Sequence, residues 1–184
     1  MKIYVDGCSF VAATGLPNKY KLAMLIGADM DMSLEGKSNP QIVHDLHNNI
    51  ENYDIFVLSF TFSVRTVIFL QGKYQLNILP GIPNDWYGDK DDFERYKAFH
   101  AYYYANMNVN YIDTLSDFYV DGAISLLKQF NKRYIIYSTE LRNSKFLKEI
   151  NQLEFVPEHL NYDKHFNEAG MLFWAEDVKK KLNE

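Results

Sequence analysis

Lys2-Ile3-Tyr4-Val5-Asp6-Gly7-Cys8-Ser9-Phe10 opens the chain, and the rest of the sequence is organised around it. Ile3, Tyr4 and Val5 favour a β-strand, the small residues that follow favour a turn, and Ser9 stands at the exit of that turn. In an open parallel sheet, ligands bind beyond the carboxyl ends of the strands. A serine delivered there by the first strand is placed to act as a nucleophile. Capping of the next helix is the simpler role for Ser9 when this stretch is considered alone.

The composition indicates one ordinary globular domain. The chain has 184 residues, of which 47% are hydrophobic and 23% charged, enough for a single domain with a real core. It has 19 Lys and Arg residues against 24 Asp and Glu residues, and the net charge of −5 argues against general nucleic-acid binding. The single cysteine, Cys8, excludes an internal disulfide and a cysteine-based zinc site. We expect no signal peptide and no membrane span, and therefore a cytoplasmic location (the host cytoplasm if the protein is viral).

Strand and helix patterns alternate along the chain. Residues 54–60 form the clearest strand, because a continuous apolar run is typical of a central parallel strand that is buried on both faces. The other expected strands are 133–138 and, more weakly, 28–34 and 153–156; the expected helices are 19–26, 39–50, 143–150 and 167–182. This alternation predicts an α/β fold, a three-layer α/β/α sandwich with a flavodoxin-like parallel sheet of about five strands.

Residues 66–130 interrupt this alternation, and we expect them to form a helical, aromatic-rich insertion within a single domain over residues 1–184. Glycine and proline residues mark loops between 66 and 90, with room for a short hairpin, and two helices are expected between 91 and 130. The cluster Tyr102-Tyr103-Tyr104 could form a lid, a substrate wall or the interface of a homo-oligomer, although packing against the sheet is the simpler explanation.

Residues suited to acyl transfer follow the inferred strands and precede the last helix. This chemistry needs a hydroxyl nucleophile, an imidazole to take its proton, a carboxylate to orient the imidazole, and donors for the developing oxyanion. Ser9, His165 and Asp163 supply the first three groups. The loop Gly36-Lys37-Ser38-Asn39 and residues 61–65 could supply the oxyanion donors. Each also has a simpler role as a turn, capping or surface residue.

These motifs, in this order, resemble those of the SGNH (GDSL-type) hydrolases, especially short phage and bacterial members with Gly-Cys-Ser-Phe near the start. Gly7-Cys8-Ser9-Phe10 stands for the Gly-Asp-Ser block of that family, Gly36 falls at its oxyanion-hole glycine, and Asp163 and His165 resemble its terminal Asp-His block. The resemblance covers nearly the whole chain. It implies a serine esterase or acylhydrolase in which Ser9 attacks the ester, His165 is the base, Asp163 orients His165, and no metal or organic cofactor is required.

The sequence departs from the family pattern after the central strand. The third block of the family is usually Gly-x-Asn-Asp, and its asparagine donates to the oxyanion, whereas residues 59–63 of this chain contain no amide side chain. Asn39, Thr61 or Ser63 would have to substitute. Loss of one such donor typically costs about a hundredfold to a thousandfold in rate.

Two further residues bear on the predicted site. Asp163 stands two residues before His165, whereas the family spacing is Asp-x-x-His, and this shorter spacing changes how the carboxylate faces the ring. Arg65 could bind an anionic group of the substrate, although a solvated arginine is the commoner case.

Other classes of function remain open from the sequence. The missing third-block asparagine favours a non-catalytic binding module or phage accessory protein with the same fold, and a transferase could use the same serine. His44 and His47 could share a metal from one helix face, but no third ligand is evident, so we expect no metal site. With no phosphate-binding or dinucleotide fingerprint, the expected partner is a small-molecule ester, not a nucleic acid or a membrane.

Overall fold

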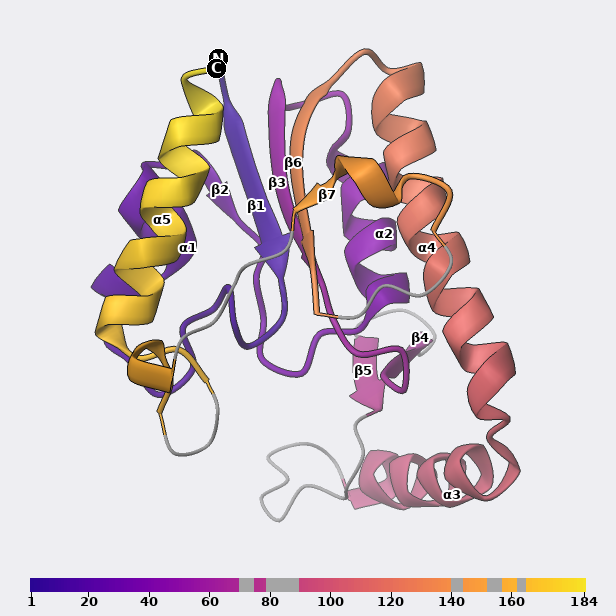
Figure 1. The fold of residues 1–184 in the computed structure, drawn as a ribbon. Helices are drawn as coiled ribbons and strands as arrows, with labels where there is room; N and C mark the ends of the chain where they lie inside the picture. The colour runs from indigo at the N-terminus through magenta and orange to yellow at the C-terminus, as the bar shows by residue number, and fades with distance from the viewer. Residues whose placement is uncertain (70–74, 79–89, 140–143, 152–156, 162–164) are drawn as a thin grey trace.

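Five parallel strands form the central sheet of the computed structural model, which describes residues 1–69, 75–78, 90–139, 144–151, 157–161 and 165–184 (Figure 1). The strand order is β2-β1-β3-β6-β7, so the predicted five-stranded parallel sheet is confirmed. The strands are β1 (Ile3–Gly7), β2 (Met30–Asp31), β3 (Ile55–Phe60), β6 (Arg133–Ser138) and β7 (Ile150–Asn151).

Helices cover both faces of this sheet, which gives the predicted three layers (Figure 1). One face is covered by α1 (Leu22–Ile26) and α5 (Glu168–Leu182), and the other by α2 (Asn39–Asn49) and α4 (Val109–Gln129). Short 3-10 turns lie at η1 (Asn18–Tyr20), η2 (Leu147–Glu149) and η3 (Pro157–His159). None of the helices in the described ranges is long and apolar enough to cross a membrane.

The central strand β3 explains the continuous apolar run in the sequence. All six of its residues are buried. Phe56 and Leu58 pack into the core shared with α2 and α4, whereas Val57 packs into the core shared with α5. Because successive side chains of a strand point to opposite faces, a strand that is covered on both faces needs apolar residues at every position.

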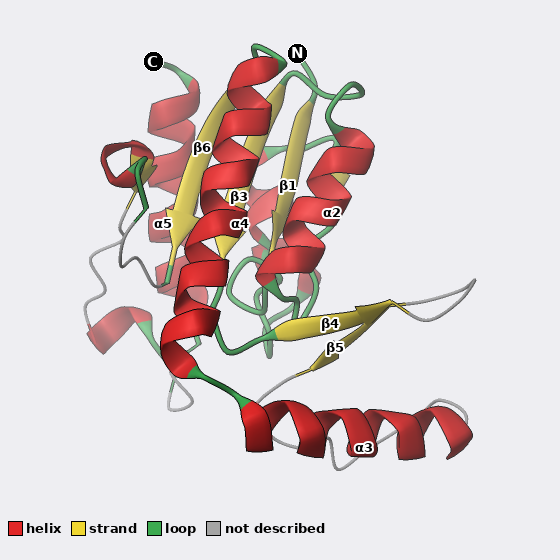
Figure 2. Ribbon diagram, turned by 90° about the vertical axis from the view of Figure 1, so that its right-hand side faces the viewer, coloured by secondary structure: helices red, strands yellow, loops and turns green. Residues whose placement is uncertain are grey.

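The segment between β3 and β6 lies partly outside the three layers. The antiparallel hairpin of β4 (Thr66–Phe69) and β5 (Gln75–Ile78) and the helix α3 (Lys90–Asn106) extend beyond the carboxyl ends of the sheet strands (Figure 2). The expected insertion 66–130 also included α4, and the C-terminal half of this helix packs directly on the sheet through Val120, Ala123, Ile124 and Leu127. The segment 66–130 therefore contributes one covering helix to the core as well as the outlying elements.

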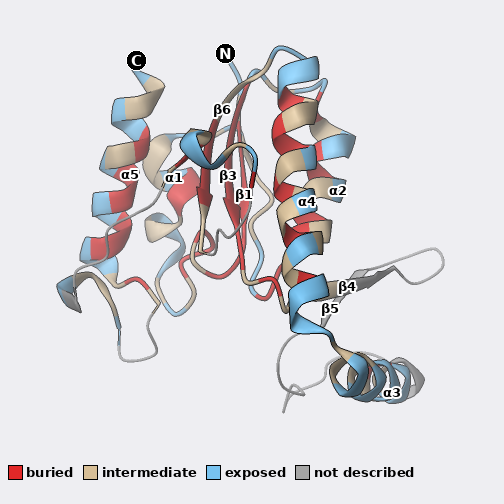
Figure 3. Cartoon of the chain, turned by 45° about the vertical axis from the view of Figure 1, so that its right-hand side comes forward, coloured by how far each residue is buried: buried red, intermediate tan, exposed pale blue. Residues whose placement is uncertain are grey.

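Several sequence expectations differ from the structure in extent. The strand expected over 28–34 is limited to the two residues of β2, and the helix expected over 143–150 is the short turn η2. The strand expected at 153–156 lies outside the described residues. The side of α5 that faces the sheet is buried and its outer side is exposed (Figure 3). Met171 and Trp174 are buried on this helix, whereas Leu172 and Phe173 are 46% and 44% exposed.

Candidate active site

Ser9 lies in the turn that follows β1, at the carboxyl end of the sheet, and is only 5% exposed. The backbone N–H of Thr14 donates to the carbonyl oxygen of Ser9 at 3.1 Å, which stabilises the turn. Gly7 allows the turn to begin close to β3, since a Cβ atom at this position would lie 3.0 Å from the carbonyl oxygen of Ser59. The glycine therefore holds the start of the Ser9 turn against the central strand.

His165 meets Ser9 from the other end of the chain. Its Nε2 atom is 3.0 Å from Ser9 Oγ, although the two residues are 156 positions apart in sequence. The ring of Phe10 packs against the imidazole at a centroid distance of 5.2 Å and against Phe166 at 5.7 Å. An imidazole nitrogen at this distance from a hydroxyl can accept its proton during nucleophilic attack.

Backbone contacts on both sides of His165 fix its position. The N–H of Asn161 donates to the carbonyl oxygen of His165 at 2.7 Å, and the Asn161 side chain donates to the carbonyl oxygen of Phe166 at 3.2 Å. Two residues further on, Asn167 caps α5 by accepting a hydrogen bond from the N–H of Gly170 at 3.0 Å. The start of α5 and the residues before it therefore present the imidazole to Ser9.

Asp163, the predicted carboxylate of the triad, lies among residues 162–164, outside the described part of the chain. Its role stays a prediction. The structure thus brings together two of the three predicted catalytic side chains, Ser9 and His165, at hydrogen-bonding distance. In the portions of the chain that the structure describes, no group of three or more His, Cys, Asp or Glu residues is placed to hold a metal ion.

Gly36 belongs to a loop that is tied to the end of β1. The N–H of Leu34 donates to the carbonyl oxygen of Gly7 at 3.1 Å. Gly36 is buried and has a φ of 73°, a left-handed conformation that favours glycine. The candidate oxyanion-hole glycine therefore lies in a loop attached to the strand that leads to Ser9, and its role in binding an oxyanion stays a prediction.

A buried ionic cluster that was not predicted from the sequence anchors this loop. Lys37 is 1% exposed, and its Nζ atom lies 2.6 Å from Asp6 Oδ1 and 2.6 Å from Asp45 Oδ2. The same ammonium group donates to the carbonyl oxygen of Met32 at 2.8 Å. The positive charge of this buried ammonium is compensated by three oxygen partners. Loss of one carboxylate would leave part of that buried charge uncompensated. The loop after β2 is therefore held to β1 and α2 by one side chain.

Asp6 is the fully buried member of this cluster, and its carboxylate is surrounded by donors. It accepts hydrogen bonds from the N–H of Gly7 at 2.7 Å and from the hydroxyl of Tyr4 at 3.0 Å, in addition to Lys37. Burial raises the pKa of Asp6 to about 7, against the opposing effect of Lys37. An aspartate within an apolar strand was the one signal in the sequence that could have indicated a buried charge pair.

The three side chains considered as substitutes for the missing asparagine have different partners. Asn39 donates from Nδ2 to the carbonyl oxygen of Thr61 at 3.0 Å and to Ser116 Oγ at 2.7 Å, and its Oδ1 accepts from the N–H of Thr61 at 2.7 Å. Ser63 donates its hydroxyl to Asp113 at 2.7 Å. The hydroxyl of Thr61 is buried and makes no hydrogen bond to any described residue. Of the three, Thr61 alone has a side-chain donor that is not already committed.

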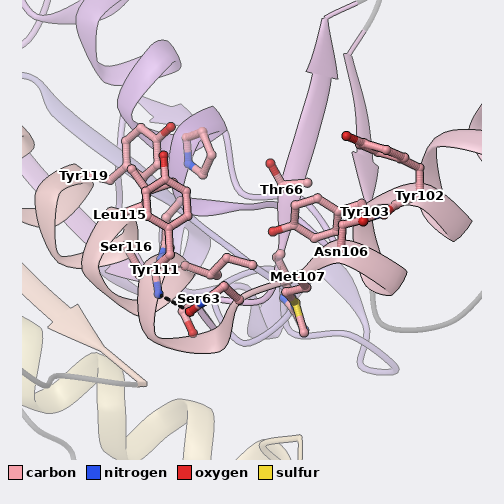
Figure 4. Close-up of a pocket in the computed structure, with 15 residues that line it drawn as sticks. Ser63, Thr66, Tyr102, Tyr103, Asn106, Met107, Tyr111, Leu115, Ser116 and Tyr119 are labelled. Atoms are coloured by element: carbon pink, nitrogen blue, oxygen red, sulfur yellow. Dashed lines mark hydrogen bonds between the residues drawn. The ribbon is translucent and has the colours of Figure 1, made fainter.

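Arg65 lies apart from Ser9, in the wall of a cavity of about 290 Å³ formed with α3 and α4 (Figure 4). Neither Ser9 nor His165 is among the described residues that line this cavity. A smaller cavity of about 20 Å³ lies beside the Ser9 turn, and its walls include Phe10, Ser59 and Phe166. This volume is about that of one water molecule.

Comparison with known proteins identifies the fold. No family model and no curated protein matches the sequence. Among solved structures, TesA matches with a TM-score of 0.59 and 12% identity over 99% of this chain and 98% of its own. The psychrotrophic esterase EstA from Pseudoalteromonas sp., in a structure inhibited by monoethylphosphonate, matches with a TM-score of 0.52 and 12% identity over 100% of this chain and 99% of its own.

These matches extend over nearly the full length of each chain, and they agree with the parallel sheet and its two helical layers. At 12% identity the likeness concerns the fold alone. The resemblance seen in the sequence is confirmed at that level: the chain shares its fold with TesA and with the esterase EstA.

Proposed function

We propose that this protein is a serine esterase or acylhydrolase that cleaves the ester bond of a small molecule. The observation that carries the proposal is the 3.0 Å contact between Ser9 Oγ and His165 Nε2. A surface serine and a capping histidine have no reason to meet across 156 residues of sequence, whereas a nucleophile and its base require this contact.

In the proposed reaction, Ser9 Oγ attacks the carbonyl carbon of the ester while His165 Nε2 takes the hydroxyl proton. The tetrahedral intermediate then collapses, the bond to the alcohol oxygen breaks, and His165 returns the proton to the leaving alcohol. Water attacks the acyl-serine with His165 again as the base, which releases the acid and restores the free serine. Asp163 is the proposed carboxylate that orients the imidazole.

The oxyanion of each tetrahedral intermediate needs donors at the same edge of the sheet. We assign this role to the backbone N–H groups of Ser9 and Gly36, with the hydroxyl of Thr61 as the proposed third donor. Asn39 and Ser63 are less suited, because their side-chain hydrogens are already donated to protein acceptors. A hydroxyl in place of an amide is expected to give a slower enzyme than a family member with the asparagine.

The similarity to EstA supports the chemistry as well as the choice of reagent. That protein is described as an esterase, and its structure was determined with a phosphonate inhibitor. Phosphonates that carry a good leaving group react with an activated serine and leave a tetrahedral phosphorus on Oγ. A fluorophosphonate therefore tests for an activated serine in this chain without knowledge of its natural substrate.

The experiment is to treat the purified protein with a fluorophosphonate and to locate the adduct by peptide mass spectrometry. We expect the adduct on Ser9. Hydrolysis of a series of p-nitrophenyl esters should fall about a thousandfold or more in Ser9→Ala. Ser125→Ala is the matched control, since Ser125 lies on α4 and donates only to the carbonyl oxygen of Asp121.

An unlabelled Ser9, with a known serine hydrolase labelled in the same tube, would overturn the proposal. Ester hydrolysis that is unchanged in Ser9→Ala would do the same. Either result would favour a non-catalytic binding module with this fold.

A further inference from the structure

A cavity between α3 and α4 has a chemistry that the proposed reaction does not use. Its volume is about 290 Å³, near the lower end of the range for small-molecule sites, roughly 300 Å³. Figure 4 shows side chains of α4, among them Tyr111, Leu115 and Tyr119, on one side and side chains of α3, among them Tyr102 and Tyr103, on the other. The space is therefore lined by two helices and by Asn39 and Pro40 at the start of α2.

Arg65 supplies the only charged side chain among the described residues of the wall. Its guanidinium lies over the ring of Phe62 at 5.3 Å, which holds the plane of the group. The Nη1 atom is shielded from solvent and donates no hydrogen bond to any residue that the structure describes. A buried guanidinium nitrogen without an acceptor is unfavourable, and an anionic oxygen is its natural complement.

The remaining polar side chains of the wall are hydroxyls and amides, and none of those described carries a negative charge. Asn39 and Ser116 are buried at the cavity and hydrogen bonded to each other at 2.7 Å. Burial raises the pKa of Tyr103, so its phenol stays a neutral donor. Asp113, which accepts from Ser63, is not among the lining residues. The electrostatic character of the wall is therefore that of one cation among hydroxyls, amides and aromatic rings.

We propose that this cavity binds a small organic carboxylate with an aromatic or apolar body. The carboxylate would pair with the guanidinium of Arg65, whose planar fork matches the two oxygens. The rings and aliphatic side chains of Tyr103, Tyr111, Ile112 and Leu115 would enclose the body of the ligand.

The charge of the wall favours a monoanion over a phosphate ester. One guanidinium balances one negative charge, whereas a dianionic phosphate would leave a second charge uncompensated in a largely apolar enclosure. The amide of the same acid would lose the ionic interaction and keep only the contacts of its body. A comparison of a carboxylate, its amide and its phosphate analogue therefore shows whether the cavity binds a monoanion, a dianion or only the apolar body of the ligand.

This inference does not depend on esterase activity, because neither Ser9 nor His165 lines the cavity. Binding is measured by titration calorimetry on the full chain carrying Ser9→Ala, with phenylacetate, phenylacetamide and phenyl phosphate as probes. We expect phenylacetate to bind at least about tenfold more tightly than either of the other two. Failure of this binding and failure of serine labelling are thus separate results.

Arg65→Gln removes the charge and should weaken phenylacetate binding at least about tenfold. Arg95→Gln makes the same change at an exposed arginine of α3 that does not line the cavity, and it should leave the affinity unchanged. Leu115→Trp fills the cavity without removing the cation, and it should abolish binding. Circular dichroism and thermal unfolding establish that each variant is folded.

Three outcomes would overturn the proposal. The first is equal affinity for phenylacetate and its amide, which would show that the negative charge of the carboxylate does not contribute to binding. The second is tighter binding of phenyl phosphate. The third is undiminished binding in folded Arg65→Gln or Leu115→Trp, which would place the ligand elsewhere.

Discussion

Thr61 separates two effects that usually occur together, a loss of rate and a loss of stability. Its hydroxyl is buried and makes no hydrogen bond to a described residue, so the isosteric change Thr61→Val removes none of the described hydrogen bonds. We expect the free energy of unfolding to change by less than about 1 kcal/mol, while kcat/KM for an ester falls about a hundredfold. Urea unfolding and steady-state kinetics measure the two quantities.

Thr61→Ser keeps the hydroxyl and should retain most of the activity. If Thr61→Val is as active as the unmodified protein, the hydroxyl is not an oxyanion donor. The backbone N–H groups of Ser9 and Gly36 would then hold the oxyanion without a side chain from this segment.

The raised pKa of Asp6 predicts how stability depends on pH. Burial shifts the pKa from 3.8 to about 7, so the folded protein binds this proton more tightly than the unfolded chain. The contribution of Asp6 to stability is therefore complete below about pH 4, decreases as the pH rises to about 7, and is constant at higher pH. In Asp6→Asn the group cannot titrate, so the unfolding free energy of the unmodified protein minus that of the variant should decrease across this window.

Urea unfolding at several pH values measures this difference. Asp177→Asn is the control, because the pKa of Asp177 is shifted in the opposite direction. Burial raises this pKa, but hydrogen bonds from Lys181 and Tyr137 lower it by more. The contribution of Asp177 to stability is lost only as the pH falls below the ordinary pKa of an aspartate, 3.8. It should therefore not decrease as the pH rises from about 4 to about 7. A difference for Asp6→Asn that increases with pH in this window would contradict the assignment.

At the scale of elements, the start of α5 determines where His165 lies, and Gly170 makes the close approach possible. A Cβ atom at Gly170 would lie 2.3 Å from the carbonyl oxygen of His159 and 2.7 Å from the ring of Phe166. Gly170→Ala should therefore destabilise the fold by about 1–3 kcal/mol and lower esterase activity, because it moves the helix away from the residues around His165.

Gly122, an exposed glycine within α4, is the matched comparison. Outside the neighbouring residues and backbone of its own helix, no described atom lies within 4 Å of a Cβ placed there, so Gly122→Ala should stabilise the protein by up to about 1 kcal/mol. Thermal unfolding of both variants tests the contrast. Equal effects of the two substitutions would mean that the contact at Gly170 does not position the helix.

The helix α4 combines two environments along one buried stripe. Its C-terminal half presents Ile124 and Leu127 to the sheet, whereas its N-terminal half presents Ile112 and Ser116 to the cavity. The polar member of the stripe, Ser116, lies where it can accept from the Asn39 amide. One helix therefore covers the sheet and also forms a wall of the proposed carboxylate site.

At the scale of the whole molecule, the parallel sheet concentrates the chemistry at one edge. The strands β1 and β3 run side by side with Gly7 opposite Ser59, so the segments that leave them begin next to each other. The turn of Ser9, the segment of Thr61 and the start of α2 therefore gather beyond the carboxyl ends of the strands, where parallel sheets bind ligands. Both chain termini lie at the opposite edge (Figure 1).

Local patterns were sufficient for the sheet and for the candidate dyad. The apolar runs around Val57 and Ile135 predict central strands because every residue of a doubly covered strand must be apolar. Ser9 and Gly36 were identified because short loops that follow parallel strands face the same edge, and His165 because it precedes the last helix. Each of these inferences depends on residues that are neighbours in sequence.

The partners of each polar side chain depended on the tertiary structure. Nothing near Lys37 in sequence indicates that Asp6 and Asp45 surround it, and nothing near Asn39 indicates that its amide is committed to Thr61. The same holds for the buried face of α5 and for the cavity between two helices.

The sequence by itself therefore determined the fold class and named Ser9 and His165 as candidates, because strand burial and turn chemistry are local properties. Only the tertiary structure decided which donors are engaged, that Nη1 of Arg65 has no acceptor among the described residues, and how far Ser9 lies from His165. Those properties arise from contacts between elements that are distant in sequence, and the packing of the layers sets them.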